Sequence, residues 1–199
     1  MKAFNNFEEA KKNAQYTGTE KLPAGAYVCK ILNVQYQNGE NGNSDLINVL
    51  FDVVEGDQQD FFKKQYDNNT AEDKKWKGRT TIWVPKDDGS EKDEWTKNSF
   101  AKWTNSFEAS NAGYTWDWDE NKWKGLVVGL NFREAGKNIE GKNVVYTEVA
   151  FPVEAQLVRD GKVKPAKFKA YNGYDSNPSE TTNNDWMSVP SGVEEIPFN

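Results

Sequence analysis

The sequence contains no histidine and only one cysteine, Cys29. Intramolecular disulfides are therefore excluded, and so are the common zinc sites, because those sites need several cysteine or histidine ligands. The lack of histidine also removes the side chain that most often acts as a general base near neutral pH. The sequence has no glycine-rich loop that could cradle a phosphate and no other catalytic motif. We therefore expect a protein that is not an enzyme and that uses no metal and no cofactor.

Long hydrophobic runs are missing as well. No stretch approaches the length of a membrane span, and residues 1–19 are polar, unlike the apolar centre of a signal peptide. We expect a cytoplasmic protein that makes no membrane contact. The 8 Trp, 8 Tyr and 11 Phe residues nevertheless supply enough bulky side chain for one core. Cys29 lies within an apolar segment and is interpreted as a small buried hydrophobe.

Positive charge is missing from the end of the chain. Residues 170–199 contain no lysine or arginine but carry five acids, in a chain whose net charge is −6. After Tyr171 the composition changes to Asn, Ser, Thr, Gly and Pro, which is typical of disordered segments. We interpret residues 1–170 as one folded domain and residues 171–199 as a flexible acidic tail.

Hydrophobic periodicity predicts a mainly β protein. Alternating and β-branched residues indicate strands at residues 26–36, 46–54, 58–66, 125–134 and 144–157. Turn residues at 38–45 join the first two strands into a hairpin, and residues 136–143 are predicted to form another turn.

One main helix is expected at residues 93–110. Its buried stripe is predicted to contain Thr96, Phe100, Trp103 and Phe107, whereas Trp95 lies off that stripe. A short amphipathic helix is also expected at residues 4–16. The order of three strands, a helix and two strands is that of a five-stranded barrel of the oligonucleotide/oligosaccharide-binding (OB) type. A β-sandwich crossed by one helix is the alternative.

Residues 61–79 combine aromatic and basic side chains in an otherwise acidic chain. A groove for single-stranded nucleic acid needs both kinds, because rings stack on unpaired bases and cations follow the phosphates. The candidate stacking residues are Tyr66 and Trp76, with Phe62 and Trp83 as second choices. The candidate phosphate-binding residues are Lys63, Lys64, Lys74, Lys75, Lys77 and Arg79. The competing interpretation is a half-buried strand with its lysines in solvent, followed by a charged loop.

The chain also resembles a known class of proteins. Glu194, Glu195, Ile196, Pro197 and Phe198 resemble the tip of bacterial and phage single-stranded DNA-binding proteins, although here Asn199 follows the phenylalanine. The body is similar to proteins from the recombination and replication modules of phages of Gram-positive bacteria, with matching stretches at residues 22–31, 50–57, 61–67, 74–78 and 114–130.

This resemblance implies a sequence-tolerant single-stranded DNA-binding protein of phage origin, located in the host bacterial cytoplasm, with an OB-type fold. It further implies self-assembly into a homo-oligomer and docking of replication and recombination proteins on residues 194–198. Two other functions stay open. One is a carbohydrate-binding module that uses Trp116, Trp118 and Trp123, and the other is a phage protein that binds or inhibits another protein through its acidic surface.

Overall fold

The computed structural model describes residues 20–40, 42–171 and 173–174. The helix expected at residues 4–16 and the tip at residues 194–198 lie outside these ranges, and so does all of the expected tail beyond residue 174.

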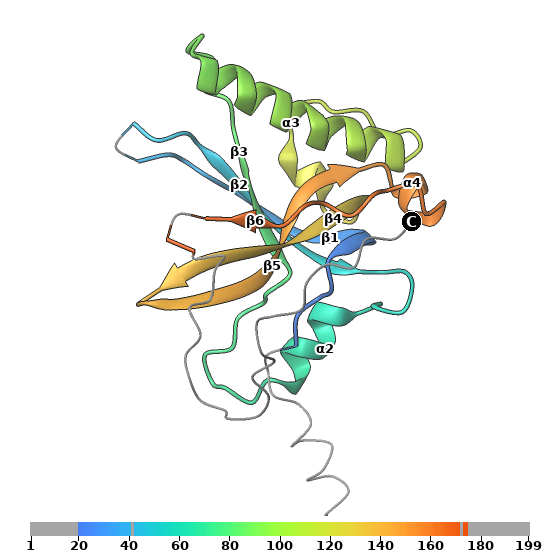
Figure 1. Ribbon diagram of the computed structural model, residues 1–199. Coiled ribbons are helices and arrows are strands. Elements are labelled where there is room, and N and C mark those ends of the chain that lie inside the picture. Colours follow the sequence, from blue (N-terminus) through green and yellow to red (C-terminus); the bar gives the residue numbers. More distant parts are fainter. Residues whose placement is uncertain (1–19, 41, 172, 175–199) are drawn as a thin grey trace, which may run out of the picture.

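In the part of the chain that the structure describes, six strands form one mostly antiparallel sheet (Figure 1). They are β1 (Gly25–Gln37), β2 (Leu46–Val53), β3 (Arg79–Trp83), β4 (Val127–Ile139), β5 (Lys142–Val153) and β6 (Lys169–Ala170). Neighbouring strands follow the order β3-β2-β1-β4-β5. The short β6 is parallel to β4 and pairs with Ala135 and Gly136, beyond the part of β4 that pairs with β1.

Within the described ranges, three α-helices and one 3₁₀ helix accompany the sheet. They are α2 (Phe61–Asn68), α3 (Glu91–Ser110), η1 (Glu120–Trp123) and α4 (Ala155–Arg159). Figure 1 shows α3 along one end of the sheet and α2 near the opposite end, with the β4–β5 hairpin projecting from the body between them. The strands therefore lie between two helices that come from different parts of the sequence.

Most of the predicted elements are confirmed, with shifted boundaries. The first two strands form the expected hairpin, in which Ile31 pairs with Phe51 and Val34 with Val49. The main helix begins two residues earlier than predicted, where the Ser90 side chain accepts a hydrogen bond from the Asp93 N–H at 3.1 Å. β4 continues to Ile139, into the predicted turn, and β5 stops at Val153, where the predicted strand gives way to α4.

The predicted strand at residues 58–66 is wrong, because Phe61–Asn68 forms α2. Phe61, Phe62 and Gln65 are buried at helical spacing, whereas Lys63 and Lys64 are exposed. A segment this short fits the periodicity of a helix as well as that of a strand. Two apolar residues followed by two lysines can face inward and outward in both.

A carboxylate from β2 holds the first turn of α2. The Asp52 carboxylate accepts hydrogen bonds from the backbone N–H groups of Phe62 and Lys63, each at 2.9 Å. Asp60, at the N-cap position, has a left-handed backbone and makes no side-chain cap. Asp52 thus satisfies two N–H groups that a helix cannot satisfy internally. Burial raises the pKa of Asp52, and the hydrogen bonds from these N–H groups oppose that shift.

The core lies between the inner face of the sheet and α3. Phe51, Phe107 and Trp123 are completely or almost completely buried, and the rings of Phe107 and Trp123 stack with their centroids 4.9 Å apart. The predicted stripe of α3 is buried as expected: Thr96, Phe100, Trp103 and Phe107. Cys29 is also buried, and burial raises the pKa of its thiol well above the usual value, which keeps it in the unreactive thiol form.

The fold class is only partly the expected one. In the described part of the chain the end strands β3 and β5 do not pair with each other, so the ladder does not close into a barrel. The strands form one sheet and not the two sheets of a sandwich. The sheet is mostly antiparallel as predicted, but the additional helices α2 and α4 make the protein mixed rather than all-β with one main helix. None of the described helices is long and apolar enough to span a membrane.

Replacing Asp52 tests the role of its carboxylate. We expect Asp52→Ala to lower the free energy of unfolding by about 1–3 kcal/mol, because two helix N–H groups lose their acceptor in a buried place. The measurement is urea denaturation followed by circular dichroism. Asp57→Ala, at an exposed carboxylate in the preceding turn, is the matched control and should change the value by less than about 0.5 kcal/mol.

The pKa of Asp52 gives this test a pH dependence. A carboxyl whose pKa is raised in the folded state stabilises the fold most when it is protonated, and this contribution is lost as the pH rises through the raised value. The difference between wild type and Asp52→Ala should therefore be larger at about pH 4 than at about pH 7. Equal stabilities of the two proteins would contradict the assigned role.

Candidate nucleic-acid interface

The structure separates the predicted binding residues into three groups. The first comprises side chains that are buried or already engaged on α2. Phe62 is buried, and its ring packs edge-on against that of Phe51 with centroids 5.6 Å apart. The prediction that Phe62 stacks on a base is therefore wrong, since the ring is part of the core. Lys63 forms an ion pair with Asp67, and Lys64 Nζ donates to the Gln59 carbonyl at 2.8 Å.

The second group comprises Tyr66 at the end of α2 and residues of the loop that follows. The rings of Tyr66 and Trp76 are half-buried and pack against each other at 5.8 Å. The ammonium group of Lys74 lies 4.5 Å from the centre of the Tyr66 ring, in a cation–π contact. Lys75 is exposed in the same loop. The aromatic and basic side chains predicted to bind DNA are therefore close together here, but Tyr66, Trp76 and Lys74 mainly contact one another.

Trp76 has a structural role in that loop. Its indole N–H donates to the carbonyl oxygens of Phe51 at 3.0 Å and of Gly78 at 3.1 Å. The backbone of Gly78 approaches β2 so closely that an added Cβ would lie 2.3 Å from the Phe51 oxygen and 2.7 Å from the Phe62 ring. The loop is therefore pinned to β2 immediately before β3 begins.

The third group lines a gap between the two end strands of the sheet. Two cavities, of about 230 and 590 Å³, lie between β3 and β5, and Glu148 and Val149 line both of them. We call the two cavities together the seam. The smaller cavity includes Lys77 and Arg79, and the larger one includes Trp83. These three predicted residues are thus brought together along one strand edge.

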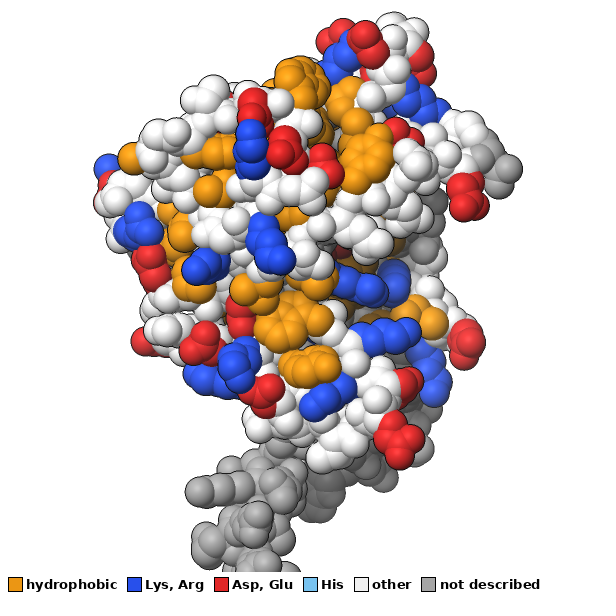
Figure 2. Space-filling model, turned by 180° about the vertical axis from the view of Figure 1, so that it is seen from behind, with side chains coloured by type: hydrophobic (Ala, Val, Ile, Leu, Met, Phe, Trp, Pro, Cys, Tyr) orange, Lys and Arg blue, Asp and Glu red, His pale blue; other side chains and the backbone are white. Residues whose placement is uncertain are grey.

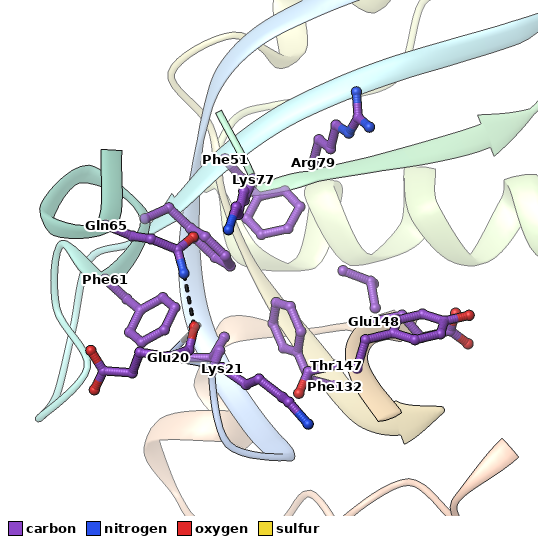
Figure 3. Close-up of a pocket in the computed structure, with 14 residues that line it drawn as sticks. Glu20, Lys21, Phe51, Phe61, Gln65, Lys77, Arg79, Phe132, Thr147 and Glu148 are labelled. Carbon is purple, nitrogen blue, oxygen red and sulfur yellow. Dashed lines mark hydrogen bonds between the residues drawn. The ribbon is translucent and has the colours of Figure 1, made fainter. Parts of the chain in front are cut away.

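Figure 3 shows the smaller cavity of the seam. The rings of Phe51, Phe61 and Phe132 come from β2, α2 and β4, and the Arg79 side chain extends away from them. The side-chain amide of Gln65 donates to the Glu20 carbonyl at 2.8 Å and ties the segment before β1 to α2. This end of the seam is thus an apolar hollow with cations at its edge.

The larger cavity carries the exposed rings of the seam. Trp83 on β3 is 49% exposed and Trp95 on α3 is 67% exposed. Phe151 on β5 is also exposed, and Tyr171 is half-buried. Large aromatic side chains in solvent cost free energy unless a ligand covers them. These rings offer flat faces at one end of the seam.

Charge in the seam opposes the charge of the whole chain. Five basic residues line it, namely Lys21, Lys77, Arg79, Lys102 and Arg133, against the two acids Glu20 and Glu148. Glu148 is engaged: it pairs with Arg133 at 2.8 Å and accepts from the Tyr171 hydroxyl at 3.0 Å. On the face shown in Figure 2, basic and acidic side chains are interspersed around hydrophobic ones. The seam is therefore a local concentration of positive charge.

Three of its cations are open to a ligand. Lys21, Arg79 and Lys102 have no ion-pair partner among the described residues. They come from the segment before β1, from β3 and from α3. An anion along the seam could reach all three elements at once.

Sequence reasoning missed several residues of the seam. Lys21, Lys102, Phe151 and Tyr171 lie far from the basic stretch in sequence and meet it only through the sheet order. One signal was present, because Trp95 stands outside the buried stripe of its helix. Among the described residues, no group of three or more His, Cys, Asp or Glu side chains is placed to hold a metal ion.

Comparison with models of known protein families gave no match, and comparison with curated proteins gave no significant match.

Replacing Trp76 tests whether its indole N–H holds the loop against β2. We expect Trp76→Phe to lower the free energy of unfolding by about 1–2 kcal/mol, because the indole N–H bonds to two backbone carbonyls are lost. Chemical denaturation provides the measurement. Trp118→Phe, at a residue whose ring is exposed, is the control and should be nearly neutral. A Trp76→Phe protein as stable as wild type would show that the loop is not held by this contact.

Proposed function

We propose that the protein binds single-stranded DNA without sequence preference and catalyses no reaction. The DNA strand lies along the seam, and the sheet is an OB-type barrel opened between β3 and β5. The proposal includes the phage origin, the homo-oligomeric state, the host cytoplasmic location and the docking of replication and recombination proteins on residues 194–198, as the resemblance of the sequence implies.

The observation that carries the proposal is the meeting of exposed rings and unpaired cations in one cleft of an acidic chain. Trp83 and Trp95 offer flat faces on which bases can stack, and Arg79 and Lys102 lie along the same gap to neutralise phosphates. Both features are what single-stranded nucleic acid requires. Stacking on rings tolerates any base, so no sequence preference is expected.

The strand order supports the OB-type assignment. Three strands precede α3 and two follow it, and their spatial order is β3-β2-β1-β4-β5. An OB barrel has the same order, with one further pairing that joins β3 to β5. In this interpretation the seam is where β3 and β5 would meet. A strand of DNA would then lie across the opening of the barrel, in contact with both edges.

The alternatives fit the geometry less well. A sugar-binding face of Trp116, Trp118 and Trp123 lacks a common platform, because Trp123 is completely buried and Trp116 is half-buried. A protein that acts only through its acidic surface gives no role to the cations of the seam. This second alternative predicts no affinity for nucleic acid at all.

Binding of a labelled oligo-dT, followed by fluorescence anisotropy at several salt concentrations, tests the proposal. We expect Trp83→Ala to weaken binding by about 5- to 150-fold, since each stacked base contributes about 1–3 kcal/mol. Arg79→Ala should weaken binding and also reduce its salt dependence by about 0.7 in the slope of log K against log salt.

Matched controls lie outside the seam. Trp118→Ala removes another exposed tryptophan and Lys124→Ala another exposed cation, and neither should change the affinity. If Trp83→Ala and Trp118→Ala bind equally well, the strand does not lie in the seam. If wild type shows no salt-dependent binding of oligo-dT, the proposed function itself fails.

Deleting residues 175–199 tests whether the acidic end competes with DNA. The deletion removes five carboxylates and no basic residue but keeps Tyr171, which lines the seam. We expect oligo-dT affinity to be unchanged or higher, because fewer negative charges compete for the same cations. Glu194→Gln with Glu195→Gln in the full chain is the matched variant and should shift affinity in the same direction. A large loss of affinity on deletion would refute the competition.

A further inference from the structure

A third cavity, of about 740 Å³, lies on the opposite face of α3 from the seam. Lys97, Phe100, Ala101 and Thr104 of α3 line this cavity, whereas Trp95, Asn98, Ser99 and Lys102 line the seam. At 100° per residue these two sets point in opposite directions from the helix axis. The two sites therefore lie on different faces of the helix and do not share these lining residues.

The lining of this third cavity is mainly apolar and aromatic, with two carboxylates. Tyr36, Trp116 and Trp118 line it, together with Asp87 and Glu120. The one cation among the described residues that line it, Lys97, is already shared between Asp87 at 2.5 Å and Asp93 at 3.0 Å. The lining therefore offers ring faces and negative charge and has no uncompensated cation.

Trp118 is placed at a cost that its own packing does not explain. Its side chain is 82% exposed, and its backbone has φ = 66°, in the left-handed region that a bulky residue rarely adopts. Its ring contacts that of Trp116 with centroids 5.9 Å apart. An exposed aromatic side chain on a strained backbone is a combination that marks binding sites.

We propose that this cavity binds a basic peptide segment of a protein partner, with a Lys or Arg side chain against the ring of Trp118. Cations are attracted to the faces of Trp and Tyr rings, and Glu120 adds an opposite charge. The volume is several times that of one side chain, which leaves room for apolar neighbours of the cation against Val84 and Pro85. Nucleic acid and the acidic residues 194–198 are repelled by the same carboxylates.

Isothermal titration calorimetry with two octapeptides tests this assignment on the full chain. The first probe has the sequence of residues 162–169, which combines four lysines with a proline and a phenylalanine and contains no acid. The second has glutamine in place of all four lysines. We expect the basic peptide to bind and the glutamine peptide to bind at least about tenfold more weakly. Equal affinities would overturn the proposal.

Variants then place the peptide in the cavity. We expect Trp118→Gly to weaken binding of the basic peptide by about three- to thirtyfold and Glu120→Gln by up to about fivefold. Glycine adopts positive φ without strain, so Trp118→Gly should unfold at a temperature no lower than wild type, and lost binding would not reflect misfolding. Trp95→Ala, on the other face of α3, is the control and should bind the peptide normally.

Full peptide affinity in Trp118→Gly would refute the site. The proposal also fails if Trp118→Gly loses binding of oligo-dT or of an oligosaccharide but keeps binding of the peptide. The cavity would then serve a different ligand. Sedimentation of the full chain distinguishes the source of the segment. Self-association that Trp118→Gly abolishes would identify the partner as a second copy of this chain.

Discussion

The contact between the Asp52 carboxylate and the first turn of α2 determines where the later elements lie. It accepts hydrogen bonds from the backbone N–H groups of Phe62 and Lys63 and so favours a helix in the segment after β2. The helix places the rings of Phe61 and Phe62 in the core. The loop that follows is then pinned to β2 through Trp76 and Gly78. Because β3 starts directly after this pinned loop, Lys77 and Arg79 enter the seam and are not left on an unconstrained surface loop.

The seam itself follows from an incomplete ladder. Exposed strand edges invite pairing with another chain, and proteins commonly protect them with charge or with covering elements. Here β3 and β5 face each other across cavities lined by cations and rings, with α2 at one end and α3 at the other. The same side chains that discourage edge-to-edge association are those that suit a polyanion with stacked bases. Protection of the edge and ligand binding can thus use one set of residues.

Local sequence patterns were enough for β1, β2, β4, β5 and α3, since their alternation and their buried stripe extend over many residues, but they did not identify the short strand β3. They failed at residues 61–68, because the acceptor that stabilises α2 comes from Asp52, outside the segment whose pattern was read. For the site, Lys77, Arg79 and Trp83 were identifiable as types of residue in a suggestive order. Their partners Lys21, Lys102 and Phe151 were not, because only strand pairing brings those residues together.

The tight packing of Gly78 has a consequence for how the chain can change during evolution. Any other residue at this position would place a Cβ 2.3 Å from a backbone oxygen of β2, which cannot move without disturbing the sheet. Lys75, three residues earlier in the same loop, faces solvent and can be exchanged at little cost. Homologues should therefore vary at exposed positions of this loop such as residue 75 while keeping glycine at position 78, and an alignment would show one invariant position in a variable stretch.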